Sequence, residues 1–134
     1  MKMILNSWKV KDLSITEKNG SPTNSLQGNF GLKTTSLFAD GTDMFAVQFE
    51  LDMHDPMYNL SIKILYEFKL LDGVVDEAFK ASSFPKVNAP AIAFPYLRAL
   101  VSTITLQAGL GPVMLPSINF NKLVEEKEDS AKNP

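Results

Sequence analysis

The chain has 134 residues, a formal net charge of −2 at pH 7, no cysteine and a single histidine. This length is typical of one domain. The lack of cysteine excludes disulfides, thiolate chemistry and cysteine-ligated metals, and the slightly acidic balance offers no basic surface for a nucleic-acid backbone. We therefore expect one domain that does not bind nucleic acid.

The first strand is predicted over residues 3–16, with a break in its pattern. Trp8 and Val10 share one phase of the alternation, whereas Leu13 and Ile15 share the other. Since successive side chains of a strand point to opposite faces, this slip predicts a β-bulge near positions 11 and 12.

The second strand is predicted over residues 28–38, where Phe30, Leu32 and Phe38 share one phase. The stretch before it, residues 17–27, is polar and contains glycine, proline and asparagine. Because this stretch is long for a tight hairpin, we expect a crossing connection between the first two strands rather than a simple turn.

Two further strands, 45–53 and 60–70, have the clearest pattern. Every second residue is apolar in both segments, and Leu65 is the one apolar residue on the opposite side of the second. Alternation over this length is the strongest strand signal that a sequence gives. The segment between them contains Pro56, which favours a turn.

Helices are predicted after Gly73. A short one is expected over 75–82 and a connector over 85–90. A long helix then begins at Pro90 and ends at Gly109, with Pro95 bending it. Its apolar face repeats at spacings of three and four and consists of Ala93, Leu97, Leu100, Ile104 and Ala108.

The surroundings of this long helix are almost uncharged. Between positions 87 and 121 the only charged residue is Arg98. A helix exposed to water on one side normally carries charges there. We therefore expect this helix to be covered on both sides, with another copy of the chain as the second cover.

A short helix over 119–127, capped by Asn119 or Asn121, completes the predicted domain. The predicted fold is α+β, a four-stranded antiparallel sheet followed by a long helix and a short C-terminal helix. We expect residues 1–127 to form a single domain and residues 128–134 to form a flexible acidic tail.

The sequence contains little catalytic chemistry. His54 is the single histidine, and with Asp52 and Asp55 it makes only a weak metal-ligand cluster. Nucleotide-binding and serine-hydrolase motifs are absent. We therefore expect no enzyme activity, no metal and no cofactor.

The apolar segments do not predict a membrane protein. The N-terminal apolar run is too short for a signal peptide, and prolines and glycines interrupt the segment 87–121. We expect a cytoplasmic protein without membrane insertion. Its nine phenylalanines and six methionines indicate apolar surface for an oligomer interface or for a client groove.

Three stretches carry a resemblance to a known family. They are N-A-P-A-I-A-F-P-Y-L-R at 88–98, L-P-S-I-N-F at 115–120, which follows Gly109-x-x-Pro112, and W-K-V-K-D-L-S-I-T at 8–16. With these motifs the chain resembles the SecB protein-export chaperones. The resemblance runs in order along nearly the whole chain and is most specific over 88–120.

The resemblance implies a dimer of dimers that holds unfolded preproteins in apolar grooves without ATP. It also implies delivery of these clients to the translocase motor SecA through an acidic face of the sheet. Asp12 and Glu67 match that acidic set, whereas Thr16 stands where a further acidic residue is expected.

Two sets of residues are predicted to carry this function. The client groove is assigned to Phe30, Leu32, Phe38 and Met44 from the sheet and to Phe79 and Phe84 from the connector. Helix and protomer packing is assigned to Leu97, Leu100, Val101 and Ile104. Both assignments depend on which apolar side chains are exposed.

The sequence is also compatible with three other functions. One is a dedicated chaperone of a single client, such as an antitoxin. Another is a module that binds a small hydrophobic ligand in the same apolar groove. A third is an interaction protein whose apolar surface is wholly used in oligomerisation.

Overall fold

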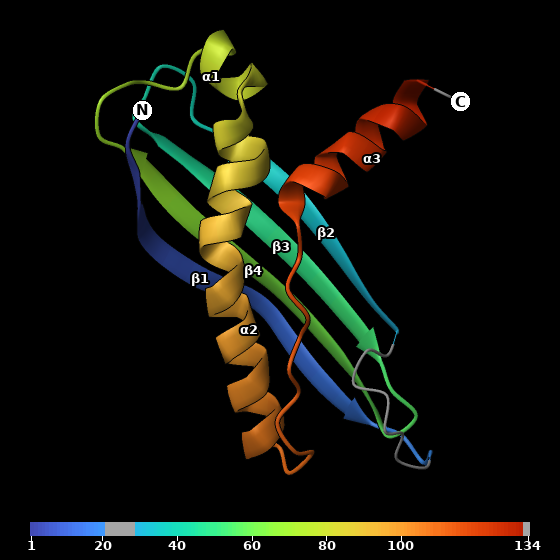
Figure 1. Ribbon diagram of the computed structural model, residues 1–134. Helices are drawn as coiled ribbons and strands as arrows, with labels where there is room; N and C mark the ends of the chain where they lie inside the picture. Colours follow the sequence, from blue (N-terminus) through green and yellow to red (C-terminus); the bar gives the residue numbers. More distant parts are fainter. Residues whose placement is uncertain (21–28, 133–134) are drawn as a thin grey trace.

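A four-stranded antiparallel sheet carries the two longer helices on one of its faces (Figure 1). The computed structural model describes residues 1–20 and 29–132. The strands are β1 (Met3–Glu17), β2 (Asn29–Phe38), β3 (Met44–His54) and β4 (Tyr58–Leu70). Their order across the sheet is β1-β4-β3-β2, so the predicted crossing between the first two strands is confirmed.

The register of β1 contains two bulges. One register break lies between Val10 and Asp12, as predicted, and a second lies between Leu5 and Ser7. The bulge after Val10 restores the phase, because Trp8, Val10 and Leu13 all pair with β4 residues that face the helices. Trp8 and Val10, before the bulge, therefore lie on the same face of the sheet as Leu13 and Ile15, after it.

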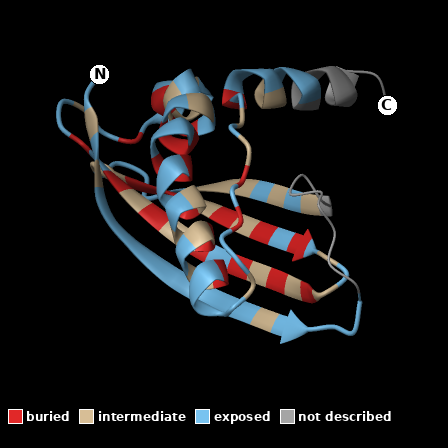
Figure 2. Cartoon of the chain, turned by 60° about the horizontal axis from the view of Figure 1, so that its bottom comes forward, coloured by how far each residue is buried: buried red, intermediate tan, exposed pale blue. Residues whose placement is uncertain are grey.

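The two central strands provide most of the core. The alternation predicted for them is confirmed, because their apolar residues face the helices and are buried (Figure 2). The largest fully buried side chains of these strands are Phe45, Val47, Phe49, Leu51, Leu60, Ile62, Ile64, Tyr66 and Phe68. The two outer strands are less covered, and most of β1 is exposed.

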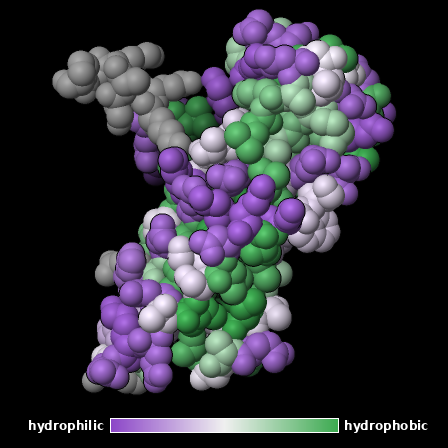
Figure 3. Space-filling model, turned by 180° about the vertical axis from the view of Figure 1, so that it is seen from behind, coloured by the Kyte–Doolittle hydropathy of each residue, from purple (hydrophilic) through white to green (hydrophobic). Residues whose placement is uncertain are grey.

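Within residues 1–20 and 29–132, no helix lies over the outward face of the sheet. Hydrophilic and hydrophobic side chains lie next to each other on this side (Figure 3). A salt bridge joins Lys63 and Glu50 at 3.4 Å, and Ser61 donates a hydrogen bond to Asp52 at 2.9 Å. This face is therefore mixed in polarity and in sign of charge.

The connection from the sheet to the long helix is irregular over residues 71–76 and mostly helical from Glu77 onward. The short helix α1 (Glu77–Ala81) is capped by Asp76, whose side chain accepts a hydrogen bond from the Phe79 N–H at 2.8 Å. The segment expected as a connector is a π-helical turn, η1 (Phe84–Asn88), which runs directly into α2 (Ala89–Gln107).

The helix α2 continues through Pro95. Proline lacks an N–H group, so the carbonyl of Ala91 loses its partner within the helix. Both residues are exposed, and water can therefore bond that carbonyl.

Helix α2 ends where the sequence predicts. Gly109 has a φ of 82°, in the left-handed region that glycine adopts at low cost. The N–H of Gly109 bonds the Leu106 carbonyl, and the N–H of Leu110 bonds the Thr105 carbonyl. This pair of bonds is a Schellman motif.

The inward face of α2 differs from the prediction. Ala93, Leu97, Val101 and Thr105 are each fully buried, whereas Leu100 and Ile104 lie half-buried at the flank. The predicted Ala108 is exposed. The prediction missed Thr105 because it counted apolar residues alone. The Thr105 hydroxyl is satisfied in the core, since it donates to the Val101 carbonyl at 2.8 Å and accepts from the Val113 N–H at 2.9 Å.

The terminal helix α3 (Phe120–Lys132) is capped by Asn119, one of the two predicted caps. The Asn119 side chain accepts a hydrogen bond from the Lys122 N–H at 3.1 Å. The helix extends beyond the predicted end at residue 127, into the segment that we expected to be a flexible tail. The division of the chain at that point stays a prediction.

By length and composition alone, the helical run Phe84–Gln107 could cross a membrane. The expectation that prolines would interrupt it is wrong for this run, because the helix accommodates Pro95. Its inward residues form part of the core against the sheet. A core helix of a soluble protein can be as long and as apolar as a membrane-spanning helix. The run is therefore weak evidence for a membrane span.

Candidate functional site

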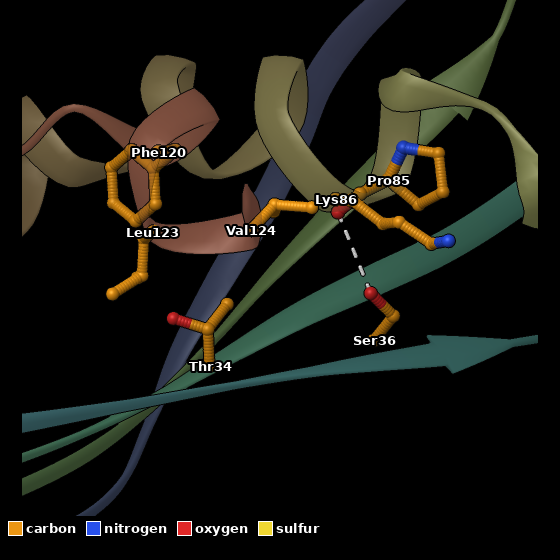
Figure 4. Close-up of a pocket in the computed structure, with 7 residues that line it drawn as sticks. All are labelled: Thr34, Ser36, Pro85, Lys86, Phe120, Leu123 and Val124. Atoms are coloured by element: carbon orange, nitrogen blue, oxygen red, sulfur yellow. Dashed lines mark hydrogen bonds between the residues drawn. The ribbon is translucent and has the colours of Figure 1, made fainter. Parts of the chain in front are cut away.

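An apolar pocket lies between β2, η1 and α3 (Figure 4). Its volume is about 240 Å³, and it is open to solvent on one side. The residues that line it are Thr34, Ser36, Pro85, Lys86, Phe120, Leu123 and Val124. None of them was predicted as a site residue.

Two contacts hold the walls of this pocket in place. The Ser36 hydroxyl donates to the Pro85 carbonyl at 3.4 Å and so joins β2 to η1. Phe120 anchors the start of α3 in the core, with its ring centroid 6.2 Å from that of Phe49 and 5.7 Å from that of Phe94. Helix α3 is therefore fixed at its first residue, and its half-buried residues Leu123 and Val124 cover the pocket.

The pocket also contains an unsatisfied polar atom. Thr34 Oγ1 is the one buried side-chain oxygen or nitrogen that has no hydrogen-bond partner in the part of the chain that the structure describes. Figure 4 shows the Thr34 side chain rising from β2 toward α3. Leaving a buried hydroxyl unpaired costs roughly 1–3 kcal/mol, so this wall of the pocket is not optimised for stability.

Three of the six predicted groove residues lie on β2, the strand that forms one wall of this pocket. Phe30 and Leu32 are half-buried on the helix-facing side of β2, in the same row as Thr34 and Ser36. They continue the apolar surface along β2 away from η1. At the opposite end of the row, the exposed edge of Phe38 belongs to an aromatic cluster.

The remaining members of the set are divided. Phe84 is half-buried and stacks on Phe79, with ring centroids 6.5 Å apart. Phe79 itself is only 2% exposed and belongs to the core. Met44 pairs with Lys69 on the outward face of the sheet, in a shallow hollow with Leu37 and Leu65. The structure therefore does not place Phe79 and Met44 on the surface of the groove.

The residues that the sequence missed had a weak signal. Leu123 and Val124 follow Phe120 at spacings of three and four in a mostly polar terminal helix, and an apolar stripe with this spacing indicates a packing face. Pro85 and Lys86 had no signal, because the segment around them was expected to be an irregular connector.

The predicted oligomer residues also divide into two groups. Leu97 and Val101 are both 0% exposed within the single chain, so they pack the helix against the sheet. Leu100 and Ile104 are half-buried and remain accessible at the flank of α2.

A second apolar surface lies beside that flank. We call it the β1–α2 face, and it consists of the exposed apolar residues Trp8, Val10, Leu13, Ile92, Tyr96 and Leu106. The rings of Trp8 and Tyr96 are 5.4 Å apart and join the strand to the helix, although these side chains are still 55% and 49% exposed.

The predicted translocase residues both lie on the outward face of the sheet. Asp12 stands opposite Lys63 in the register, and Glu67 accepts a hydrogen bond from the Asn6 side chain at 3.3 Å. Lys69 follows on the same face of β4 and pairs with Asp43 at 3.9 Å. The negative charge of this face is therefore countered by neighbouring lysines.

Metal-binding chemistry is limited. Within residues 1–20 and 29–132, no group of three histidine, cysteine, aspartate or glutamate side chains could hold a metal ion. The exposed His54 Nδ1 lies 3.1 Å from the Asn59 side-chain oxygen.

The comparison with families of known proteins decides the classification. A family described as preprotein translocase subunit SecB matches residues 2–131. The chain belongs to the SecB family. The resemblance found in the sequence is thereby confirmed.

Relatives of this SecB-family chain span different parts of it. The protein-export protein SecB of Mesorhizobium japonicum is 27% identical over 135 residues, which cover 91% of this chain and 78% of that protein. An uncharacterised protein of Methanocaldococcus jannaschii is 39% identical over 74 residues, or 55% of this chain. The match spans 45% of that archaeal protein, and a match to SecB of Anaplasma phagocytophilum spans 26% of its length.

Solved structures confirm the SecB-like α+β fold. A SecB-like chaperone of Mycobacterium tuberculosis, solved in complex with a ChAD peptide from the HigA1 antitoxin, superposes with a TM-score of 0.67 at 13% identity and 87% coverage of both chains. A protein of unknown function from Streptococcus agalactiae gives a TM-score of 0.66 at 14% identity, covering 88% of this chain and 98% of that one.

Proposed function

We propose that this SecB-family chain is an ATP-independent holdase without enzyme activity, which binds unfolded polypeptide segments along β2. The observation that supports this most is the half-open apolar pocket between β2, η1 and α3, continued by Phe30 and Leu32. Apolar side chains of an unfolded client gain about 25 cal/mol for each Å² removed from water. Because such burial is not directional, one groove can accept many sequences.

The size of the pocket favours a polypeptide over a small ligand. Pockets for small molecules usually enclose about 300–1,000 Å³ and bury most of the ligand. The pocket here has about 240 Å³ and is open on one side. It suits one or two side chains of an extended segment, and it gives less support to a module for a free hydrophobic molecule.

A second candidate function is that of a chaperone dedicated to one client. Its support is the structural likeness to the SecB-like chaperone solved with an antitoxin peptide. A dedicated chaperone should bind one peptide far more tightly than peptides of scrambled sequence, whereas a general holdase should bind both with similar affinity.

The proposed assembly is a homo-oligomer, a dimer of dimers, formed through the β1–α2 face. The support is that this face leaves Trp8, Tyr96 and Leu106 exposed together, on a helix whose outer side carries no charge. Exposed apolar patches of this kind mark interaction surfaces. Leu100 and Ile104 border the face and would be buried with it.

Delivery to SecA is a further proposal, and it places the protein in the cytoplasm. Its support is the position of Asp12 and Glu67 on the sheet face that no helix covers. Because Lys63 and Lys69 lie on the same face, we expect docking there to be weak and sensitive to salt.

The holdase proposal can be tested with two variants of α3. Leu123→Asp places a charge in the pocket wall, whereas Asn121→Asp adds the same charge two residues earlier, at an exposed position about half a helical turn away. The assay measures light scattering of an aggregating model client, reduced insulin, without nucleotide. Leu123→Asp should lose most of the suppression, and Asn121→Asp should keep it.

Three results would contradict this proposal or redirect it. A wild-type protein that forms an oligomer but suppresses no aggregation would indicate that oligomerisation uses the apolar surface. A wild-type monomer without suppression would end the chaperone proposal. Equal suppression by both variants would move the client site away from this pocket.

A further inference from the structure

The two edges of the sheet differ in how they are protected. The β1 edge is interrupted by two bulges and carries Lys9 and Lys11 around the second one. Bulges and lysines are devices by which proteins keep other strands from pairing with a sheet edge. The β1 edge is therefore a poor template for an added strand.

The β2 edge has no bulge and a single lysine. It pairs one-to-one with β3 from Asn29–His54 to Phe38–Phe45, without a register break. Within the described residues it contains no proline, and its one charged residue is Lys33. A regular, nearly uncharged edge strand of this kind is a ready template for another chain.

The backbone groups of this edge are also available. Every second N–H and C=O of an antiparallel edge strand points away from its one partner. In the part of the chain that the structure describes, β2 makes backbone hydrogen bonds to β3 and to no other element. Among the described residues no strand lies beyond β2, and in Figure 1 only α3 projects past this edge, near the upper end of the strand.

We propose that an unfolded client adds to the β2 edge as a fifth strand. This inference rests on the proposed holdase function and specifies how the client is held. The occupant is an extended polypeptide segment with apolar residues at every second position.

The geometry of the pocket fits this mode of binding. An added strand lies about 4.8 Å from β2, and its same-face side chains repeat every ~6.7 Å. That repeat matches the inward row of Leu32, Thr34 and Ser36 on β2. A side chain on the inward face of the added strand would therefore lie beside the pocket under α3, while its outward neighbours stay in solvent.

Strand addition also explains selection for the unfolded state. The hydrogen bonds involve only the client backbone and are independent of its sequence. A folded protein has already paired its strands and helices, so it has no free segment to offer. The inward side chains add affinity without restricting the client to one sequence.

The test uses three synthetic peptides and the unmodified protein. The probe is a fluorescein-labelled ten-residue peptide in which leucine and phenylalanine alternate with threonine and lysine. Two derivatives carry N-methyl groups on three amides, either at the odd or at the even positions. Each set blocks the N–H groups on one side of the extended peptide only.

The expected result is a difference between the two methylated peptides. The derivative whose methyl groups face β2 should bind roughly tenfold or more weakly than the parent, because it loses several hydrogen bonds. The other derivative should bind within about twofold of the parent. Amide hydrogen exchange should in addition slow at alternate β2 positions when the parent peptide is bound.

The remaining outcomes are decisive against the proposal. Equal affinity of the two methylated peptides, at any level, overturns strand addition while the client-binding function stands. Alternate β2 amides that are already protected in the free protein would show that a second copy occupies the edge, which also overturns it. If the parent peptide does not bind, the holdase function itself fails and strand addition fails with it.

Discussion

The Nε of Arg98 donates a hydrogen bond to the carbonyl oxygen of Leu115 at 3.0 Å, across 17 residues of the chain. This bond ties the helix α2 to the segment 110–119, which we call the strap and which leads from α2 to α3. Thr105 makes a second tie through the Val113 N–H. The two motifs F-P-Y-L-R and L-P-S-I-N-F are thus in direct contact, and the strap determines where α3 begins.

The tie at Thr105 predicts a stability effect. Thr105→Val preserves the shape of the side chain but leaves the buried Val113 N–H without its acceptor. The free energy of unfolding should fall by roughly 1–3 kcal/mol, as measured by urea denaturation. Thr105→Ser keeps the hydroxyl and is the matched control, with a smaller loss from the missing methyl group. Equal losses for both variants would show that packing rather than the hydrogen bond holds the strap.

The end of α2 gives a second prediction. Gly109 has a positive φ and no neighbouring atom within contact range of an added Cβ, so Gly109→Ala changes backbone strain alone. We expect a loss of about 1–2 kcal/mol. Gly31 in β2 also has free space but no positive φ. Gly31→Ala should therefore raise stability slightly, by up to about 1 kcal/mol, and losses of similar size at both positions would contradict the strain argument.

Much of this fold could be predicted because its signals are local. The alternation in β3 and β4, the phase slip before Asp12 and the glycine stop at Gly109 each depend on a few neighbouring residues. The inward face of α2 was harder, because Thr105 is buried through a partner in the strap that no local pattern reveals.

The candidate site was predicted less well for the same reason. Phe79 and Phe30 are equally apolar in the sequence, yet one is core and the other is partly exposed. Exposure depends on how β2, η1 and α3 meet, and these elements are distant in the chain. Met44 was placed in the groove because a residue type indicates apolarity but not the face of the sheet.

The buried tyrosine Tyr66 predicts a loss of stability in alkaline solution. Burial raises the pKa of Tyr66 far above its ordinary value near 10. The unfolded chain ionises this phenol first, so the stability is complete below pH 10 and falls as the pH rises above that value. Urea denaturation between pH 8 and pH 11 should show this fall, and Tyr66→Phe should reduce its slope. An unchanged slope in Tyr66→Phe would assign the effect to other groups.

The β1–α2 face predicts the oligomeric state of a surface variant. Tyr96→Lys places a charge in the centre of this face, beside Trp8. If the face is the protomer interface, light scattering should show a lower mass while circular dichroism stays unchanged. Met114→Lys alters an exposed apolar residue of the strap and is the control, expected to keep the wild-type mass. An unaltered mass for Tyr96→Lys would place the interface elsewhere.

The unsatisfied hydroxyl of Thr34 predicts that its removal stabilises the protein, in contrast to the removal of the Thr105 hydroxyl. Thr34→Val removes a buried oxygen without a described partner and keeps the volume of the side chain. The free energy of unfolding should rise by about 1 kcal/mol, as measured by urea denaturation, while aggregation suppression stays at its wild-type level because the pocket remains apolar. Ser36→Ala, which breaks the bond to the Pro85 carbonyl, should instead lower stability. A loss of stability in Thr34→Val would show that the hydroxyl is bonded in solution, for example by a buried water, which would make it a fixed polar contact inside the pocket.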